Sequence, residues 1–248
     1  MSSSTFWKSH FESNLKKQHI DWSLLPTITK AEIEAISYSL KVWQLGETSD
    51  GKTLTALCEK HALQTNDPDF LYSMQLFIKE EQKHGANLGR YIDLIGLQRL
   101  KKNWGDTFFR FFRHLNNSLE SFTITVIIAE YAAQVFYQAL HDATNCDLLK
   151  SICVDILKDE AHHIKFQNQR LLHFFKEKSV YAKAFAVAWY CLFFFGTIHA
   201  IWLDHHKAFE AGGINKREFF RMMYQKFFKT ISYLHQKEAT FQTRLEVV

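Results

Sequence analysis

The stretch FIKEEQKHGANLGRYIDLIG, residues 77–96, carries the first pattern that decides the fold class. Glu81 and His84 stand three residues apart in it, so on a helix they differ by about 60° around the axis and share one face. The same spacing recurs at Glu160 and His163. Each pair can hold one metal ion. One such pair is weak evidence, because a chain with 13 His is expected to contain roughly one by chance.

Two further glutamates strengthen the pattern. Glu130 lies in TITVIIAEYAAQVF, residues 123–136, where the surroundings are apolar on all sides. An unpaired carboxylate buried there would cost several kcal/mol, so it needs a cation. Glu47 ends the run KVWQLGE, and successive glutamates of the set are 34, 49 and 30 residues apart. Each separation is long enough for the chain to complete one helix, turn and run back in a second helix.

The order is therefore Glu, Glu-x-x-His, Glu, Glu-x-x-His. It matches the ferritin-like carboxylate di-iron bundles, in which two helices contribute one Glu each and two contribute a Glu-x-x-His pair. We expect an all-α fold, a ferritin-like four-helix bundle with additional C-terminal helices. The predicted metal ligands are Glu47, Glu81, His84, Glu130, Glu160 and His163.

The domain organisation follows from composition and from helix-start signals. Only 9 Gly and 2 Pro, against 47% hydrophobic residues, favour long helices. We predict one ferritin-like domain over residues 1–248, with the metal-binding bundle at about 29–176 and extra helices at about 179–240. A capping box at residues 29–32 opens the first predicted helix, and residues 97–114 are expected to connect the second predicted helix to the third.

The two Glu-x-x-His regions resemble a known family. KEEQKHG, residues 79–85, is similar to the first iron motif of the acyl-carrier-protein desaturases, E-E-N-R-H-G, and DEAHH, residues 159–163, resembles their second motif, D-E-x-x-H. The likeness covers roughly residues 40–175, about half of the chain. The superfamily also contains the p-aminobenzoate N-oxygenases, and this chain is most similar to oxidases of these two types.

This resemblance implies roles for individual residues. Glu81 and Glu160 would bridge the two metal ions, and His84 and His163 would each bind one of them. Ligand imidazoles usually donate their second N–H to a carboxylate or carbonyl. Asp159 is the predicted acceptor for one imidazole and Glu80 for the other, and no catalytic residue beyond the ligands is assigned.

The resemblance also implies a function. We expect an O2-activating oxidase or oxygenase with two Fe ions, or a Mn/Fe pair, that oxidises an apolar small molecule or acyl substrate. An external electron donor and a homodimer belong to this expectation. Two alternatives stay open: a ferroxidase or iron-handling protein, and a rubrerythrin-like protein that reduces peroxide. The motifs do not specify the substrate.

Charge and cysteine content narrow the function classes. The formal net charge of +4 is too small and too evenly mixed with acidic residues to indicate a nucleic-acid partner. The four cysteines form no C-x-x-C pair, which argues against a zinc knuckle, a rubredoxin-type site and a complete rubrerythrin. The N-terminal residues show no basic region followed by an apolar run, so we expect a cytoplasmic protein.

One segment raises the question of a membrane. Residues 184–203, AFAVAWYCLFFFGTIHAIWL, contain no Asp, Glu, Lys or Arg and are long enough to cross a bilayer. We expect this helix to be covered by the protein's own core, at the wall of a substrate pocket, or by a neighbouring subunit. Contact with a membrane is the alternative that the sequence leaves open.

Overall fold

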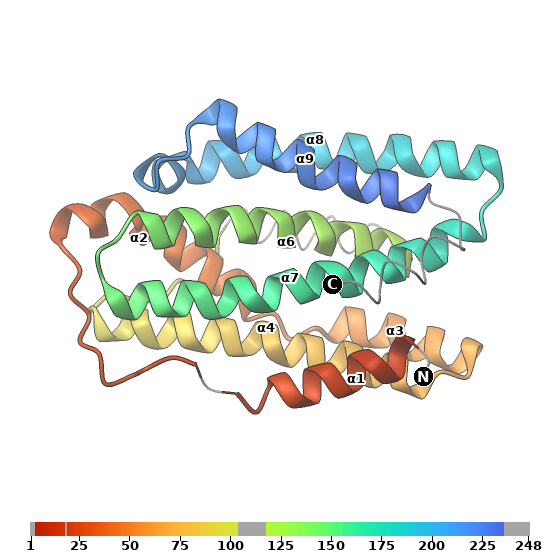
Figure 1. Cartoon of the computed structure of the whole chain (residues 1–248), viewed down its shortest axis with the longest axis horizontal. Helices are drawn as coiled ribbons and strands as arrows, with labels where there is room; N and C mark the ends of the chain where they lie inside the picture. Colours follow the sequence, from red (N-terminus) through yellow and green to blue (C-terminus); the bar gives the residue numbers. More distant parts are fainter. Residues whose placement is uncertain (1–2, 18, 104–117, 236–248) are drawn as a thin grey trace.

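The computed structural model describes residues 3–17, 19–103 and 118–235, and the regular structure within these ranges is helical (Figure 1). Residues 104–114 of the predicted connecting segment lie outside the described residues. The helices are α1 (Ser3–Asn14), α2 (Lys30–Glu47), α3 (Lys52–Thr65), α4 (Pro68–Leu94), α6 (Leu119–Asp142), α7 (Asp147–Lys176), α8 (Val180–Ala211) and α9 (Lys216–Leu234).

Helices α2, α4, α6 and α7 form the bundle that was predicted to carry the metal ligands. Helix α6 packs along α7, α2 packs along α4, and α4 contacts α7 across the bundle. Helix α6 is enclosed by α7, α8 and α9, which explains why its sequence is apolar on all sides. Its side chains Ile127 and Phe136 are fully buried. The predicted all-α fold with additional C-terminal helices is confirmed.

The predicted capping box at the start of α2 is present, and its glutamate also makes a long-range hydrogen bond. The backbone N–H of Thr29 donates to Glu32 Oε2 at 2.7 Å, while Glu32 Oε1 accepts from the backbone N–H of Asn145 at 2.7 Å. The hydrogen bonds from Thr29 are the main reason why the pKa of Glu32 is lowered to about 2. One carboxylate thus ties the beginning of α2 to the loop that precedes α7.

Helices α1 and α3 were not predicted. Trp7 and Phe11 of α1 are buried and pack with Phe77 and Phe166 in a second apolar cluster. Because α1 packs along α4, the packed part of the chain begins well before residue 29. In Figure 1, α1 and α3 lie beside α4, on the side of the bundle opposite to α8 and α9.

Helices α8 and α9 form a layer over α6, and the turn between them lies against α6. A side chain at Gly212 would place its Cβ 2.2 Å from the carbonyl oxygen of Ala139, so only glycine permits this close approach. The inward face of α8 is buried, and its Phe194 ring stacks on Phe227 of α9 at 4.1 Å between ring centroids.

Among the described residues, two helices are long and apolar enough to cross a membrane, α6 and α8. Most of α6 is buried inside the protein, whereas only 28% of the apolar window of α8 is. The expectation that residues 184–203 are covered therefore holds for the inward face of α8 but not, within one chain, for its outward face.

Candidate metal centre

The six predicted ligands come from four helices and meet in the middle of the bundle. Glu47 is the last residue of α2, and Glu130 lies in the middle of α6. Helix α4 supplies one Glu-x-x-His pair and helix α7 the other. A pair with this spacing projects from one helical face, and here both faces point to the same interior region.

Glycine at position 85 lets the end of α2 come close to α4. A Cβ at Gly85 would lie 2.9 Å from the methyl group of Thr48 and 3.1 Å from the backbone carbon of Glu47. Gln44 of α2 donates to the carbonyl oxygen of Gly85 at 3.3 Å across the same contact. The glycine that follows His84 therefore brings Glu47 within reach of the α4 ligands.

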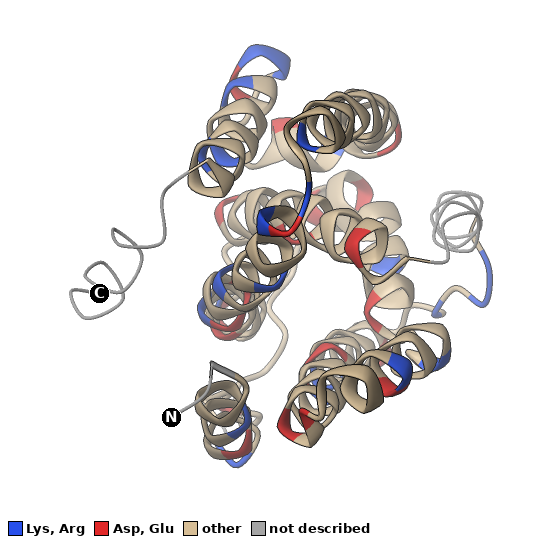
Figure 2. Cartoon of the chain, turned by 90° about the vertical axis from the view of Figure 1, so that its right-hand side faces the viewer, with Lys and Arg blue, Asp and Glu red and all other residues tan. Residues whose placement is uncertain are grey.

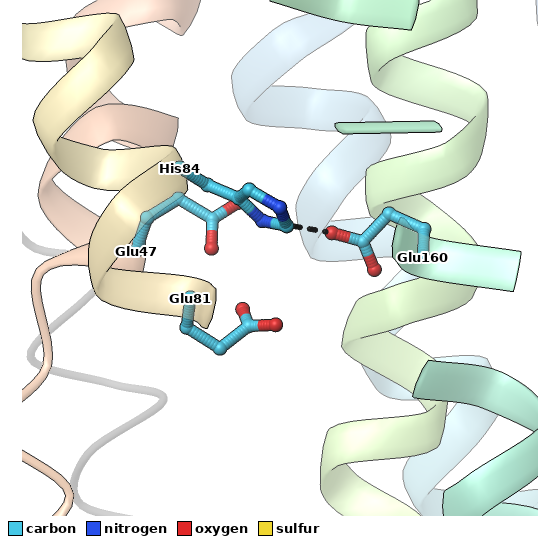
Figure 3. A group of neighbouring side chains, drawn as sticks. All are labelled: Glu47, Glu81, His84 and Glu160. Atoms are coloured by element: carbon cyan, nitrogen blue, oxygen red, sulfur yellow. Dashed lines mark ion pairs between the residues drawn. The ribbon is translucent and has the colours of Figure 1, made fainter. Parts of the chain in front are cut away.

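The ligand atoms form two groups, each with its donor atoms within 4.8 Å of one another. One group consists of Glu47, Glu81, His84 and Glu160, shown in Figure 3, and the other consists of Glu81, Glu130, Glu160 and His163. Glu81 and Glu160 belong to both groups. The bridging role that the resemblance to the desaturases implies for these two carboxylates stays a prediction.

Burial makes these groups unusual in the absence of a cation. His84, Glu160 and His163 are 0% exposed, and Glu130 is 5% exposed. Both carboxylate oxygens of Glu160 and the Nδ1 atoms of both histidines lack hydrogen-bond partners. Orphaned buried polar atoms of this kind are rare and costly. Because all of them face one another, the residues fit two metal ions.

The pKa shifts show that the cluster attracts positive charge. Burial and the neighbouring carboxylates Glu81 and Glu160 raise the pKa of Glu47 and of Glu130 well above the usual value. Burial alone would lower the pKa of His163, but the surrounding carboxylates raise it well above 6.5. Without metal the site therefore retains protons, which metal ions would displace on binding.

Glu81 differs from the other carboxylates. Burial alone would raise its pKa, but the imidazoles of His163 and His84 lower it to about 2. His163 Nδ1 lies 2.7 Å from Glu81 Oε1, yet neither atom has a hydrogen bond of normal geometry. A proton on His163 would account for this close approach in the metal-free site, and a metal ion would take the place of that proton.

The outer nitrogen of each histidine points to a carboxylate on the opposite helix. His84 Nε2 lies 3.0 Å from Asp159 Oδ2, and His163 Nε2 lies 2.9 Å from Glu80 Oε2. If Nε2 carries the proton and donates, Nδ1 is left with a free lone pair that points into the cluster. Asp159 and Glu80 thus hold the positions in which the sequence predicted acceptors for the ligand imidazoles.

Asn14 connects the two outer carboxylates. Its side-chain nitrogen donates to Glu80 Oε1 at 2.8 Å and to Asp159 Oδ1 at 2.7 Å. Lys83 Nζ lies 3.3 Å from Asp159 Oδ2 and adds a positive charge on the same side. Sequence reasoning missed Asn14, because it lies in an unpredicted helix far from every motif. No signal in the sequence pointed to it.

Other polar and aromatic residues lie around the cluster. Tyr137 donates its phenol hydrogen to Glu47 Oε1 at 2.6 Å, and burial raises the pKa of this phenol well above 10. His162 is exposed, with its ring near His10 at 4.4 Å between centroids. His205 is buried, and its Nδ1 lies 3.0 Å from Ser39 Oγ. Neither histidine belongs to a metal-binding group among the described residues.

No protein-family model matches the sequence, and no curated protein matches it. Solved structures do match the fold. A variant of an R2-like ligand-binding oxidase with an aerobically reconstituted Mn/Fe cofactor superposes with a TM-score of 0.66, at 16% identity over 92% of each chain. A second variant with an aerobically reconstituted cofactor gives 0.63, at 16% identity over 94% of this chain and 92% of that one.

A third structure, a variant with an anaerobically reconstituted Mn/Fe cofactor, gives a TM-score of 0.60 at 15% identity over 94% of this chain and 92% of that one. Similarity at this level of identity concerns the fold, and it extends over nearly all of both chains. The chain therefore has the fold of the R2-like ligand-binding oxidases, a ferritin-like helical bundle with additional C-terminal helices.

Proposed function

We propose that this protein is a dinuclear non-haem oxidoreductase that activates O2 and oxidises an organic molecule. One observation carries the proposal: two groups of buried Glu and His donor atoms that share Glu81 and Glu160. The fold supports it, because the solved structures with this fold are described as oxidases with a Mn/Fe cofactor. We propose two Fe ions or a Mn/Fe pair.

In this proposal each histidine would hold one metal ion through Nδ1. Glu47 would complete the group with His84, Glu130 would complete the group with His163, and Glu81 and Glu160 would contribute to both groups. When bound, such a metal pair supplies the electrons that reduce O2 and allows oxidation of an organic substrate. The protein holds the ligands in place through the outer carboxylates and keeps water away by burying them.

The substrate in this proposal is an apolar small molecule or an acyl compound, and the electrons come from an external donor. The similar oxidases are described as ligand-binding, which supports an organic ligand beside the metals. We further propose a cytoplasmic homodimer. Sedimentation of the purified protein tests the homodimer, and cell fractionation tests the location.

Metal loading tests the core of the proposal. After anaerobic incubation with Fe(II), alone and together with Mn(II), elemental analysis should give about two ions per chain, since two groups of donor atoms share two bridges. Admission of air should then consume O2 in an amount stoichiometric with the metal pairs. A metal content near zero, or one zinc ion alone, would contradict the assignment.

The same experiment separates the oxidase from the iron-handling alternative. A ferroxidase continues to consume O2 when excess Fe(II) is added and accumulates many Fe(III) ions per chain. For the proposed oxidase, consumption stops after one reaction per metal pair unless a reductant and a substrate are added. Continued mineralisation of iron would therefore favour storage, and rapid turnover of peroxide would favour a rubrerythrin-like activity.

A further inference from the structure

The outward face of α8 is an apolar surface that this chain leaves uncovered. Tyr181, Phe185, Leu192, Phe195 and Leu203 are between 39% and 89% exposed. Successive residues of this set are four, seven, three and eight positions apart. These spacings are close to whole helical turns, so the five side chains form one stripe along the helix. Of the large apolar side chains that are exposed in the described residues, half belong to α8 and α9. Such a concentration marks a contact surface.

Helix α9 extends this surface and adds positive charge. Arg217, Arg221, Tyr224 and Phe228 follow one another at spacings of four, three and four residues, so they share a helical face. The Tyr224 ring lies 5.7 Å from the ring of Phe195 on α8. This contact joins the basic face of α9 to the apolar stripe of α8, and we call the combined surface the α8/α9 face.

The net positive charge of the chain lies on α9, because the charged residues of α8 balance one another. Residues 180–234 contain seven Lys and Arg against three Asp and Glu, which equals the formal net charge of +4 of the whole chain. The rest of the chain is therefore balanced. Figure 2 shows α8 mostly without charged residues and α9 with several basic positions. An exposed apolar stripe beside basic side chains is complementary to an anionic lipid surface.

We propose that the α8/α9 face docks this protein onto an anionic lipid bilayer. The apolar side chains of α8 enter the boundary between headgroups and acyl chains, and Arg217 and Arg221 contact lipid phosphates. A second copy of the chain is a less suitable occupant, because two such faces would bring like charges together. The proposal does not depend on the metal centre, and it offers a route by which an apolar compound could reach the protein.

Docking is peripheral. The inward side chains of α8, including Tyr190, Phe194 and Ile198, are at most 1% exposed and pack on α6 and α9. Insertion of α8 across a bilayer would remove these contacts and leave the apolar surfaces of α6 and α9 that α8 covers without a partner. A helix that keeps its inward face on the protein can bury only its outward face in lipid.

Vesicle flotation of the full-length protein tests the proposal. The protein should float with vesicles of equal parts phosphatidylglycerol and phosphatidylcholine, and roughly tenfold less with phosphatidylcholine alone. The double variant Phe185→Ser, Leu192→Ser should lower binding to the anionic vesicles by about tenfold or more. Leu63→Ser is the matched control, since Leu63 on α3 is 85% exposed, and it should bind like the wild type.

Charge variants test the basic part of the α8/α9 face, which lies on α9. Arg217→Gln, Arg221→Gln should weaken binding to anionic vesicles by about tenfold and leave binding to phosphatidylcholine unchanged. Lys60→Gln, Lys158→Gln removes the same charge from exposed positions on α3 and α7 and should have little effect. Thermal unfolding and metal content are measured for every variant to confirm that the fold is intact.

Three results would overturn the proposal. Equal binding of the wild type to neutral and anionic vesicles would exclude the electrostatic contact. Retention of native protein in cell membranes after an alkaline carbonate wash would indicate a spanning helix. A homodimer that dissociates in the Phe185→Ser, Leu192→Ser variant, with no binding to vesicles, would assign the α8/α9 face to a second copy. Peripheral docking is supported if the apolar and the arginine double variants both float less than the wild type and if carbonate releases the protein from membranes.

Discussion

Replacement of Asn14 by alanine would remove the only described side chain that contacts both outer carboxylates, Glu80 and Asp159. Two hydrogen bonds are lost, of 2.8 Å and 2.7 Å, and each has a carboxylate as its acceptor. Hydrogen bonds to charged groups contribute about 1.5–3 kcal/mol each. Asn14 is itself partly exposed. We therefore expect each lost hydrogen bond to lower the free energy of unfolding of the metal-free protein by an amount at the lower end of this range.

The larger effect should appear in metal binding. Each outer carboxylate contacts one of the proposed ligand histidines, at 3.0 Å to His84 and 2.9 Å to His163. Loss of such outer contacts typically lowers metal affinity by about 10–100-fold. Because Asn14 contacts both carboxylates, its removal should weaken both metal positions together. The stoichiometry at saturation should remain about two per chain, because all six ligands are intact.

Anaerobic competition of Fe(II) between the protein and a chromophoric chelator measures this affinity. Gln169→Ala is the matched control: it removes the 2.7 Å hydrogen bond from Trp7 of α1 but leaves the outer carboxylates untouched. Asn14→Ala should lower the affinity by about 10–100-fold and Gln169→Ala by much less. Equal effects of the two variants would show that Asn14 acts only by docking α1. An unchanged affinity in Asn14→Ala would refute the positioning role altogether.

Three further results are expected. Glu130→Ala should abolish binding of at least one metal ion, whereas exposed Glu210 can be replaced by alanine without loss, and equal metal content by elemental analysis would contradict the ligand assignment. The folded-state pKa values of Glu130 and His163 are raised, so both groups stabilise the metal-free fold at low pH, and its melting temperature should fall as pH rises above 6.5. A rise in melting temperature over that range would show that these protons are not held. Gly212→Ala should destabilise the protein by about 1–3 kcal/mol because its Cβ would collide with the α6 backbone, whereas Gly196→Ala, with open space around it, should be neutral or stabilising in urea unfolding.

The sequence by itself predicted the set of candidate ligands and determined the helices that carry them. Spacing along one helix is a local property, so Glu81 and His84, or Glu160 and His163, share a face wherever the helix is placed. The apolar surroundings of Glu130 are equally visible in the sequence. The capping box at Thr29 marked the start of α2 for the same reason, since it involves residues only three positions apart.

Only the tertiary structure decided which residues support and surround this set. Asn14 reaches the outer carboxylates because α1 packs along α4, a contact between segments more than sixty residues apart that no local pattern encodes. The sequence likewise did not show which face of α8 is exposed. An apolar run has the same sequence whether its faces meet protein, lipid or water, and the packing of α8 on α6 and α9 determines which of its faces is left uncovered.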